Sequence, residues 1–190
     1  MRYSLAAAGA AGLFLLSHAS DIPVVQISNG TVQGSRSGTV DNFLGIPFAQ
    51  PPVGELRFRP PLPVNTSFGI LNATGLPRAC AQLPQDVDPG TYQQIPASDF
   101  APYSVFTEAP SDDGEDCLTL NIQRPAMATA DSKLPVLFWI YGGGFNTGST
   151  QSNDWAALVA ESVSLGHPIL VVQANYRLQA FGFLGGSEGT

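Results

Sequence analysis

Residues Leu134–Phe145 read Leu-Pro-Val-Leu-Phe-Trp-Ile-Tyr-Gly-Gly-Gly-Phe, and this stretch decides the fold. A second apolar run, Ile169–Ala174, reads Ile-Leu-Val-Val-Gln-Ala. Almost unbroken apolar runs of this length are typical of strands that are buried on both faces of a sheet. We therefore expect both runs to be strands inside a sheet that helices cover.

The stretch between the two runs favours a crossover helix. Residues Asp154–Leu165 can form that helix, with Asn153 or Asp154 as its N-cap and Gly166 as its terminator. Strand, helix and strand in this order form a right-handed crossover between two parallel strands. The sequence therefore predicts an α/β fold.

The rest of the chain reads as short strands joined by long irregular segments. The expected strands are Val24–Ile27, Thr31–Gly34, Val40–Leu44 and Leu118–Ile122. Asn29-Gly30 indicates a hairpin between the first two. Repeated prolines make residues 47–64 an extended surface segment, and residues 81–116 read as one long loop.

Composition limits the possible functions. The 190 residues are 44% hydrophobic and 12% charged, with a formal charge of −7 and a mean hydropathy of +0.09. This is a folding composition of the size of one domain. The acidic charge makes nucleic acid a poor partner. The 20 glycines and 16 prolines argue against a coiled coil, a helical bundle or a polytopic membrane protein.

Residues 1–19 resemble a targeting segment. Met1-Arg2 is followed by an apolar stretch from Leu5 to Leu16 and then by Ser17-His18-Ala19, which has the small residues of a cleavage site. The apolar stretch is too short to span a bilayer comfortably, although a membrane anchor is the alternative. We expect a signal peptide, secretion, and no stable membrane insertion after cleavage.

Two further features suit an extracellular protein. The only cysteines, Cys80 and Cys117, both follow the proposed signal peptide, so either one disulfide or two buried thiols can form. Three Asn-x-Ser/Thr sequons, at Asn29, Asn65 and Asn72, are candidate glycosylation sites.

The glycines after the first apolar run are the main candidate binding element. Without Cβ atoms, the N–H groups of such a loop can approach a phosphate or an oxyanion closely. A phosphate loop would need lysine where Ser149 stands, and the dinucleotide pattern fails at Thr147. An oxyanion-binding loop remains, as in α/β-hydrolases. The alternative is an ordinary flexible turn.

Four motifs in order give the chain a family resemblance. They are Phe43–Gly54 with Arg57-Phe58, then Glu115–Asn121, then Trp139–Phe145, and finally Asn175–Leu178 with Phe181–Leu184. Together they resemble the type-B carboxylesterases and lipases, including fungal secreted lipases. The resemblance implies the N-terminal part of an α/β-hydrolase fold, with small antiparallel N-terminal strands followed by the first strands of the central mixed sheet. It also implies carboxylic ester hydrolysis through an acyl-enzyme.

The resemblance assigns roles to several residues. Gly143 and Gly144 match the oxyanion-hole donors of the family. Cys80 and Cys117 match its first disulfide, whose loop carries the lid in the lipase branch. Arg57 and Glu115 match a structural ion pair. No metal or organic cofactor is expected.

The acidic residues near Glu115 allow other interpretations. Glu115-Asp116 could be a solvated loop, while a glycosidase pair would need two carboxyl groups on opposite sides of one substrate, which adjacent residues seldom provide. The acidic cluster also lacks a calcium-loop pattern. Its members are Asp112, Asp113, Glu115 and Asp116.

Ester hydrolysis also needs a serine, a base and an orienting acid. The family carries the serine on an elbow beyond the strand that ends at Asn-Tyr-Arg, so residues 20–190 are expected to be a partial domain truncated before it. Gly185–Gly189 matches Gly-x-Ser-x-Gly, but a glycine pair precedes Ser187 where a buried strand is required, so we reject this serine. His167, the one histidine after the proposed signal peptide, has no family role.

Two functions follow. The first is a serine esterase or lipase acting on small-molecule or lipid esters, for which this chain carries the oxyanion loop without the triad and is inactive alone. The alternative is a non-catalytic, cholinesterase-like binding or adhesion protein. Ending at Thr190, the sheet is also expected to have an open edge and an uncovered apolar face.

Overall fold

The computed structural model describes residues 22–82, 110 and 112–185. The proposed signal peptide, most of the 81–116 segment and Ser187 lie outside the described residues.

A five-stranded mixed sheet forms the centre of the fold. Its strands, in spatial order, are β3 (Ser35–Ser37), β4 (Val40–Pro47), β8 (Thr119–Pro125), β10 (Leu170–Ala174) and β9 (Val136–Trp139). β9 and β10 are parallel, and the other neighbours are antiparallel. The helix α3 (Ala156–Ser164) connects the parallel pair. The predicted α/β fold is therefore confirmed.

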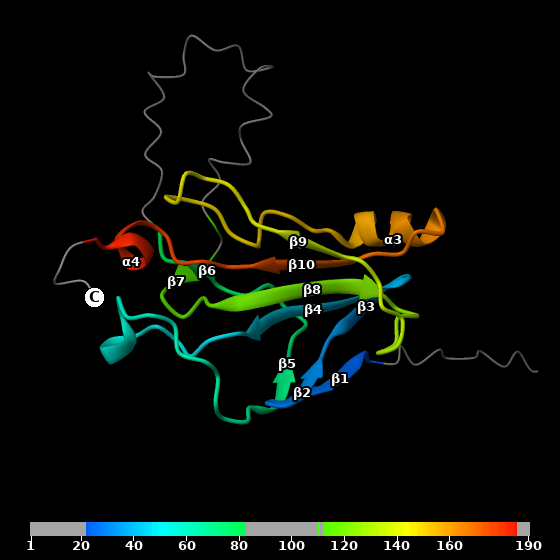
Figure 1. Cartoon of the computed structure of the whole chain (residues 1–190), viewed down its shortest axis with the longest axis horizontal. Helices are drawn as coiled ribbons and strands as arrows, with labels where there is room; N and C mark the ends of the chain where they lie inside the picture. The colour runs from blue at the N-terminus through cyan, green and yellow to red at the C-terminus, as the bar shows by residue number, and fades with distance from the viewer. Residues whose placement is uncertain (1–21, 83–109, 111, 186–190) are drawn as a thin grey trace, which may run out of the picture.

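A three-stranded sheet lies beside the central one (Figure 1). It contains β1 (Val24–Ile27), β2 (Gly30–Gln33) and β5 (Gly69–Asn72). β1 and β2 form the expected hairpin, with Ser28 and Asn29 in the turn. Gly30 is the first residue of β2, where it pairs with Ile27 and has a φ of 137°. β5 was not expected, and it joins β2 in parallel, so the small sheet is mixed where an antiparallel one was expected.

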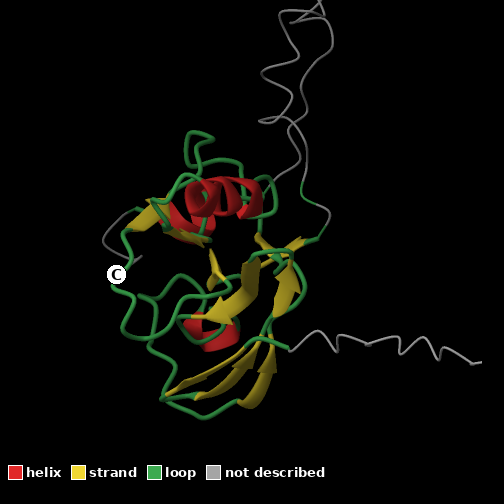
Figure 2. Ribbon diagram, turned by 90° about the vertical axis from the view of Figure 1, so that its right-hand side faces the viewer, coloured by secondary structure: helices red, strands yellow, loops and turns green. Residues whose placement is uncertain are grey.

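The central sheet is covered differently on its two faces, and Figure 2 shows α3 and the small sheet on opposite sides of it. On one face, Val40 packs with Val159 of α3 and Val171 of β10. On the other face, Phe43 packs with Val32 and Ala73. Side chains that alternate along β4 thus enter two separate apolar clusters, as the twofold period of a strand requires.

β9 is only partly covered. The expected strand 134–141 is regular over four residues, and its side chains alternate between half-buried and exposed. Val136, Phe138 and Ile140 are 60%, 54% and 66% exposed. Among the described residues, α3 covers one face of this strand and nothing packs on the other.

The remaining elements are short. They are η1 (Gly54–Leu56), β6 (Ala79–Cys80), β7 (Asp113–Gly114) and α4 (Gln179–Phe183). The one-turn helix η1 interrupts the extended segment expected at 47–64. Within the residues that the structure describes, no helix combines the length and apolar character needed to cross a bilayer.

Two of the sequence motifs meet at a bulge in β4. The register between β4 and β8 shifts at Gly45, which has a φ of 80°. The Gly45 N–H donates to Oδ1 of Asn121, a fully buried residue of β8, at 2.9 Å. A bulge of this kind leaves one backbone group unpaired, and the Asn121 side chain satisfies it.

The crossover helix begins two residues later than expected, and Gln123 contacts its start. Trp155 stands at the N-cap and donates its N–H to Gln123 Oε1 at 2.9 Å. Asp154, one of the two expected caps, accepts from Ala156 N–H at 2.9 Å.

The end of α3 is a Schellman turn, as Gly166 indicated. His167 N–H donates to Ser162 O at 2.9 Å, and Gly166 N–H donates to Val163 O at 3.1 Å. Gly166 has a φ of 74°, in the left-handed region that favours glycine.

Replacing Gly166 tests this turn. A Cβ at Gly166 would meet nothing within 4 Å, so Gly166→Ala changes only the backbone preference. We expect it to lower the free energy of unfolding by about 1 kcal/mol in urea titrations. Gly75→Ala is the matched control, because it also adds a Cβ in open space but at an ordinary φ. Equal effects of the two substitutions would contradict the assignment.

Candidate functional site

The glycine loop, residues Gly142–Gly148, follows β9 directly and is closed by its own backbone. The Gly143 carbonyl accepts from Asn146 N–H at 3.1 Å and from Thr147 N–H at 3.2 Å. Gly143 and Gly144 have φ values of 129° and 61°. A Cβ at Gly143 would collide with the Thr147 carbonyl, whereas one at Gly144 would have open space. Position 143 therefore requires glycine for close approach, and position 144 for its φ alone.

The N–H groups of residues 142–145 have no partner in the described part of the chain, and they include the two candidate oxyanion donors. Neither the Gly143 nor the Gly144 N–H donates to any group in the described part of the chain. The Gly144 N–H shares a trans peptide with the Gly143 carbonyl, so the two point in opposite directions. Fixing that carbonyl inside the turn therefore directs the Gly144 N–H outward, as oxyanion binding requires.

A pair of tyrosines fixes the base of the loop. The rings of Tyr141 and Tyr176 stack at 4.3 Å between centroids. Tyr141 OH donates to Tyr176 O at 3.1 Å and accepts from Tyr176 N–H, while Tyr176 OH donates to Tyr141 O at 2.6 Å. Burial raises the pKa of both phenols, so both remain protonated and able to donate. The pair joins the carboxyl ends of β9 and β10.

The buried Asn175 secures the chain beyond the loop. Its Oδ1 accepts from Thr150 N–H at 3.0 Å, and its Nδ2 donates to Arg78 O at 3.0 Å. The Asn-Tyr-Arg motif is thus placed against the glycine loop by two successive residues, Asn175 and Tyr176.

Two glutamines that the sequence analysis did not single out also contact the loop. Gln82 binds Thr147 and Gly148, and Gln179 binds Phe145 and Asn146. Gln82 lies 65 residues from Thr147, and no spacing pattern connects residues so far apart.

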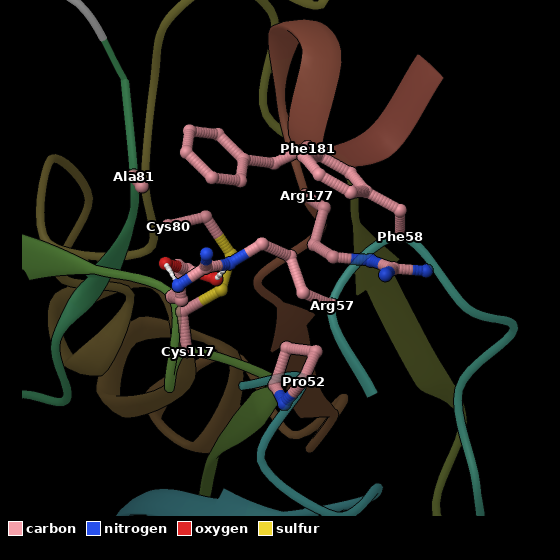
Figure 3. A pocket seen from close by; sticks show the side chains of 9 residues that line it. Pro52, Arg57, Phe58, Cys80, Ala81, Cys117, Arg177 and Phe181 are labelled. Atoms are coloured by element: carbon pink, nitrogen blue, oxygen red, sulfur yellow. Dashed lines mark hydrogen bonds and ion pairs between the residues drawn. A yellow bond between two sulfur atoms is a disulfide. The ribbon is translucent and has the colours of Figure 1, made fainter. Parts of the chain in front are cut away.

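The expected disulfide and ion pair lie together (Figure 3). Cys80 and Cys117 are bonded. The Arg57 guanidinium donates two hydrogen bonds, of 2.5 and 2.6 Å, to the Glu115 carboxylate, and these hydrogen bonds raise the pKa of Arg57. The cavity beside them has a volume of about 10 Å³, which is space for one water.

A second hollow, of about 690 Å³, lies between β4, the 47–51 segment and residues 64–78. Neither hollow includes Gly143 or Gly144. Gly143 is half-buried and Gly144 is exposed.

The other charged candidates have structural partners. Asp112 pairs with Arg78 at 3.1 Å, and Asp113 accepts from Gln82 N–H at 3.2 Å. In the described ranges, no group of three or more His, Cys, Asp or Glu side chains could hold a metal ion. His167 lies in the turn that ends α3, and Ser187 is outside the described residues.

The three sequons differ in their surroundings. Asn29 is half-buried, and its Nδ2 donates to Val64 O at 3.0 Å and to Thr66 O at 3.3 Å. Asn65 and Asn72 are exposed. Asn72 Oδ1 accepts from Thr74 Oγ1, the hydroxyl of its own sequon, at 2.8 Å.

Comparison with known proteins decides the family. The model of the carboxylesterase family matches residues 21–189. The chain belongs to this family. It is 44% identical over 177 residues to "Secreted lipase 1" of Botryotinia fuckeliana. This alignment covers 87% of the chain and 29% of that lipase. It is 45% identical over 167 residues to "Secreted triacylglycerol lipase LIP1" of Gibberella zeae, with 86% and 28% covered.

Solved structures of carboxylesterases show the same fold. Aspergillus niger EstA matches with a TM-score of 0.70 and 32% identity over 88% of this chain and 28% of its own. A thermophilic pNB esterase matches with a TM-score of 0.66 and 31% identity. The chain therefore contains part of an α/β-hydrolase fold, and it spans less than a third of the length of the two secreted lipases.

The two loop glycines should respond differently to alanine. We expect Gly143→Ala to cost about 3 kcal/mol of stability, because its Cβ forces the Thr147 carbonyl away. Gly144→Ala should cost about 1 kcal/mol, because only its φ is unfavourable. Chemical denaturation of the two variants measures the difference. A smaller loss for Gly143→Ala than for Gly144→Ala would contradict this loop geometry.

The sequons give a separate test in a eukaryotic secretion host. We expect a glycan on Asn72, whose Nδ2 has no partner among the described residues, and none on Asn29 in the folded protein. A sugar on Asn29 Nδ2 would replace one of its two hydrogens and so remove one of the two hydrogen bonds that hold the hairpin to residues 64–66. Peptide mass mapping checks both sites, with Asn72→Gln as the control. Folded, monomeric protein glycosylated at Asn29 would contradict the expectation.

Proposed function

We propose that this chain supplies the oxyanion-binding wall of a carboxylic ester hydrolase that works through an acyl-enzyme. The observation that carries the proposal is at Gly143 and Gly144, beyond the carboxyl end of a parallel strand. Their N–H groups have no partner among the described residues, and the Gly144 N–H is directed out of the turn. Natural proteins rarely leave adjacent backbone donors without partners unless a ligand uses them.

These donors suit one step of ester hydrolysis. When a nucleophile attacks an ester carbonyl, negative charge develops on the carbonyl oxygen. N–H groups already aimed at that oxygen stabilise the transition state without reorganising, and one donor contributes about 3–4 kcal/mol. The nucleophile, base and acid are the residues that the family resemblance places beyond Asn175–Arg177.

The surface around the loop favours esters with apolar acyl groups. Phe145 and Phe183 are 62% and 55% exposed, and their rings meet edge to face at 4.9 Å. Such an apolar rim beside oxyanion donors supports a lipid or aryl ester substrate. The relatives named as secreted lipases, together with residues 1–19, support secretion of this carboxylesterase.

The alternative is a non-catalytic binding or adhesion protein. A binding module has no need for unpartnered oxyanion donors, so the loop favours the enzyme. The two functions differ in the fate of the nucleophilic serine, which only the enzyme requires.

The test is hydrolysis of p-nitrophenyl butyrate by the protein made from its complete coding sequence. We expect saturable hydrolysis that a serine-reactive phosphonate abolishes. We also expect at least a 100-fold loss of kcat in Gly143→Ala, because its Cβ displaces the Thr147 carbonyl and so misdirects the N–H donors of the loop. No phosphonate-sensitive hydrolysis would favour the binding protein.

Residues 20–190 expressed alone provide the second arm of this test. This segment should release no more product than a heat-denatured sample, because no triad is expected in it. A saturable rate from this segment would contradict the rejection of Ser187.

A further inference from the structure

We propose that Gln82 and Gln179 are positioning residues that clamp the glycine loop and hold the Gly143 and Gly144 N–H groups outward. Only the catalytic consequence of this clamp rests on the proposed function. The clamp itself is a set of hydrogen bonds between side chains and backbone that can be tested separately.

Gln179 binds the two peptide groups whose N–H groups donate to the Gly143 carbonyl. Its N–H donates to Phe145 O at 2.9 Å, and its Nε2 donates to Asn146 O at 2.9 Å. The N–H groups of these same two peptides, from Asn146 and Thr147, donate to Gly143 O. Each peptide is therefore bonded at both its carbonyl and its N–H, and neither can rotate without losing both bonds.

The two hydrogen bonds to Gly143 O set the direction of the Gly144 N–H. A trans peptide places its carbonyl and N–H on opposite sides, so the Gly144 N–H is directed away from the turn as long as Gly143 O is held inside it. If the peptide rotated, the carbonyl would point toward the substrate and would repel a developing oxyanion. Gln179 opposes this rotation from outside the loop.

Gln82 holds the other end of the loop. Its Oε1 accepts from Thr147 Oγ1 at 2.8 Å and from Gly148 N–H at 3.0 Å. Its Nε2 donates to Gly148 O at 3.1 Å and to Cys80 O at 3.0 Å. All four hydrogen-bonding positions of the amide are used, and they join the glycine loop to the backbone of the disulfide-bonded Cys80.

The loop needs such bonds because packing and backbone preference do not hold it. Phe145 is 62% exposed, and Phe145 and Gln179 have φ values of 62° and 51°. Non-glycine residues in this region cost about 1 kcal/mol or more each and persist only where their surroundings fix them. The two glutamine side chains provide that fixation.

Amide hydrogen exchange tests the clamp directly in the full chain. We expect Gln179→Ala to raise exchange at Thr147 about tenfold, and Gln82→Ala to do so at Gly148, because these amides lose support. Asn146 should change less, because the backbone N–H of residue 179 still donates to Phe145 O. Alanine at 179 keeps the unfavourable φ, so only the side-chain bond is removed. Gln50→Ala is the matched control, because it removes two side-chain bonds, to Pro63 O and Asn65 Oδ1, that do not touch the loop. Unchanged exchange at Thr147 and Gly148 would overturn the clamp.

Kinetics test its catalytic consequence in the protein made from the complete coding sequence. Gln82→Ala and Gln179→Ala should each lower kcat for p-nitrophenyl butyrate about tenfold and leave KM unchanged, since misdirected donors weaken binding of the transition state alone. If the parent hydrolyses the ester and kcat falls no more than in Gln50→Ala, the positioning role is overturned while the proposed function stands. If the parent is inactive, the proposed function fails, and the exchange rates still decide whether the clamp exists.

A pH profile separates positioning from simple loss of stability. Gln82→Glu keeps both acceptor positions but, when ionised, has no donor for Cys80 O or Gly148 O. Protonation of the introduced carboxyl restores one donor. The kcat of this variant relative to the parent should therefore rise as the pH falls from 7 toward the carboxyl pKa of about 4.3. A constant ratio across that range would overturn the donor role of Gln82.

Discussion

The direction of one peptide group governs the candidate site. Asn146 and Thr147 hold the Gly143 carbonyl inside a five-residue turn, and the rigid trans peptide converts this into an outward direction for the Gly144 N–H. The glycine requirement at 143 follows from the same contact, because the Thr147 carbonyl occupies the space of a Cβ. The chemistry proposed for the carboxylesterase depends on that orientation more than on the identity of any side chain in the loop.

The fold provides the fixed points from which this turn is held. Parallel pairing of β9 and β10 brings Tyr141 and Tyr176 together, although 35 residues separate them. The disulfide brings Cys80 to Cys117 and so places Gln82 at the far end of the loop. The turn around Gly143 is thus held by contacts with residues that are distant in the sequence. This is how a loop with little buried apolar surface can be kept in one conformation.

The sequence predicted what depends on local pattern. Apolar runs predicted β9 and β10, and Gly166 predicted the end of α3. The glycines at 142–144 indicated a loop after β9, and its oxyanion role stays a prediction. β5 was missed because Gly69–Asn72 is short and becomes a strand only by pairing with β2. Gln82 and Gln179 were missed for a similar reason. A glutamine has no distinctive spacing, and its role arises from contacts 65 and 33 residues away.

The uncovered face of β9 and the unpartnered donors occur at the same place in the chain. Val136, Phe138 and Ile140 leave apolar surface exposed directly before the loop that leaves two N–H groups unbonded among the described residues. Each feature alone costs stability, the first through hydration of apolar surface and the second through unmade hydrogen bonds. The exposed apolar face is the one that a partial domain is expected to leave uncovered, so no ligand is needed to explain it. The unbonded N–H groups beside it are the donors that we propose to face the oxygen of an attacked ester, and the developing oxyanion would accept their hydrogen bonds.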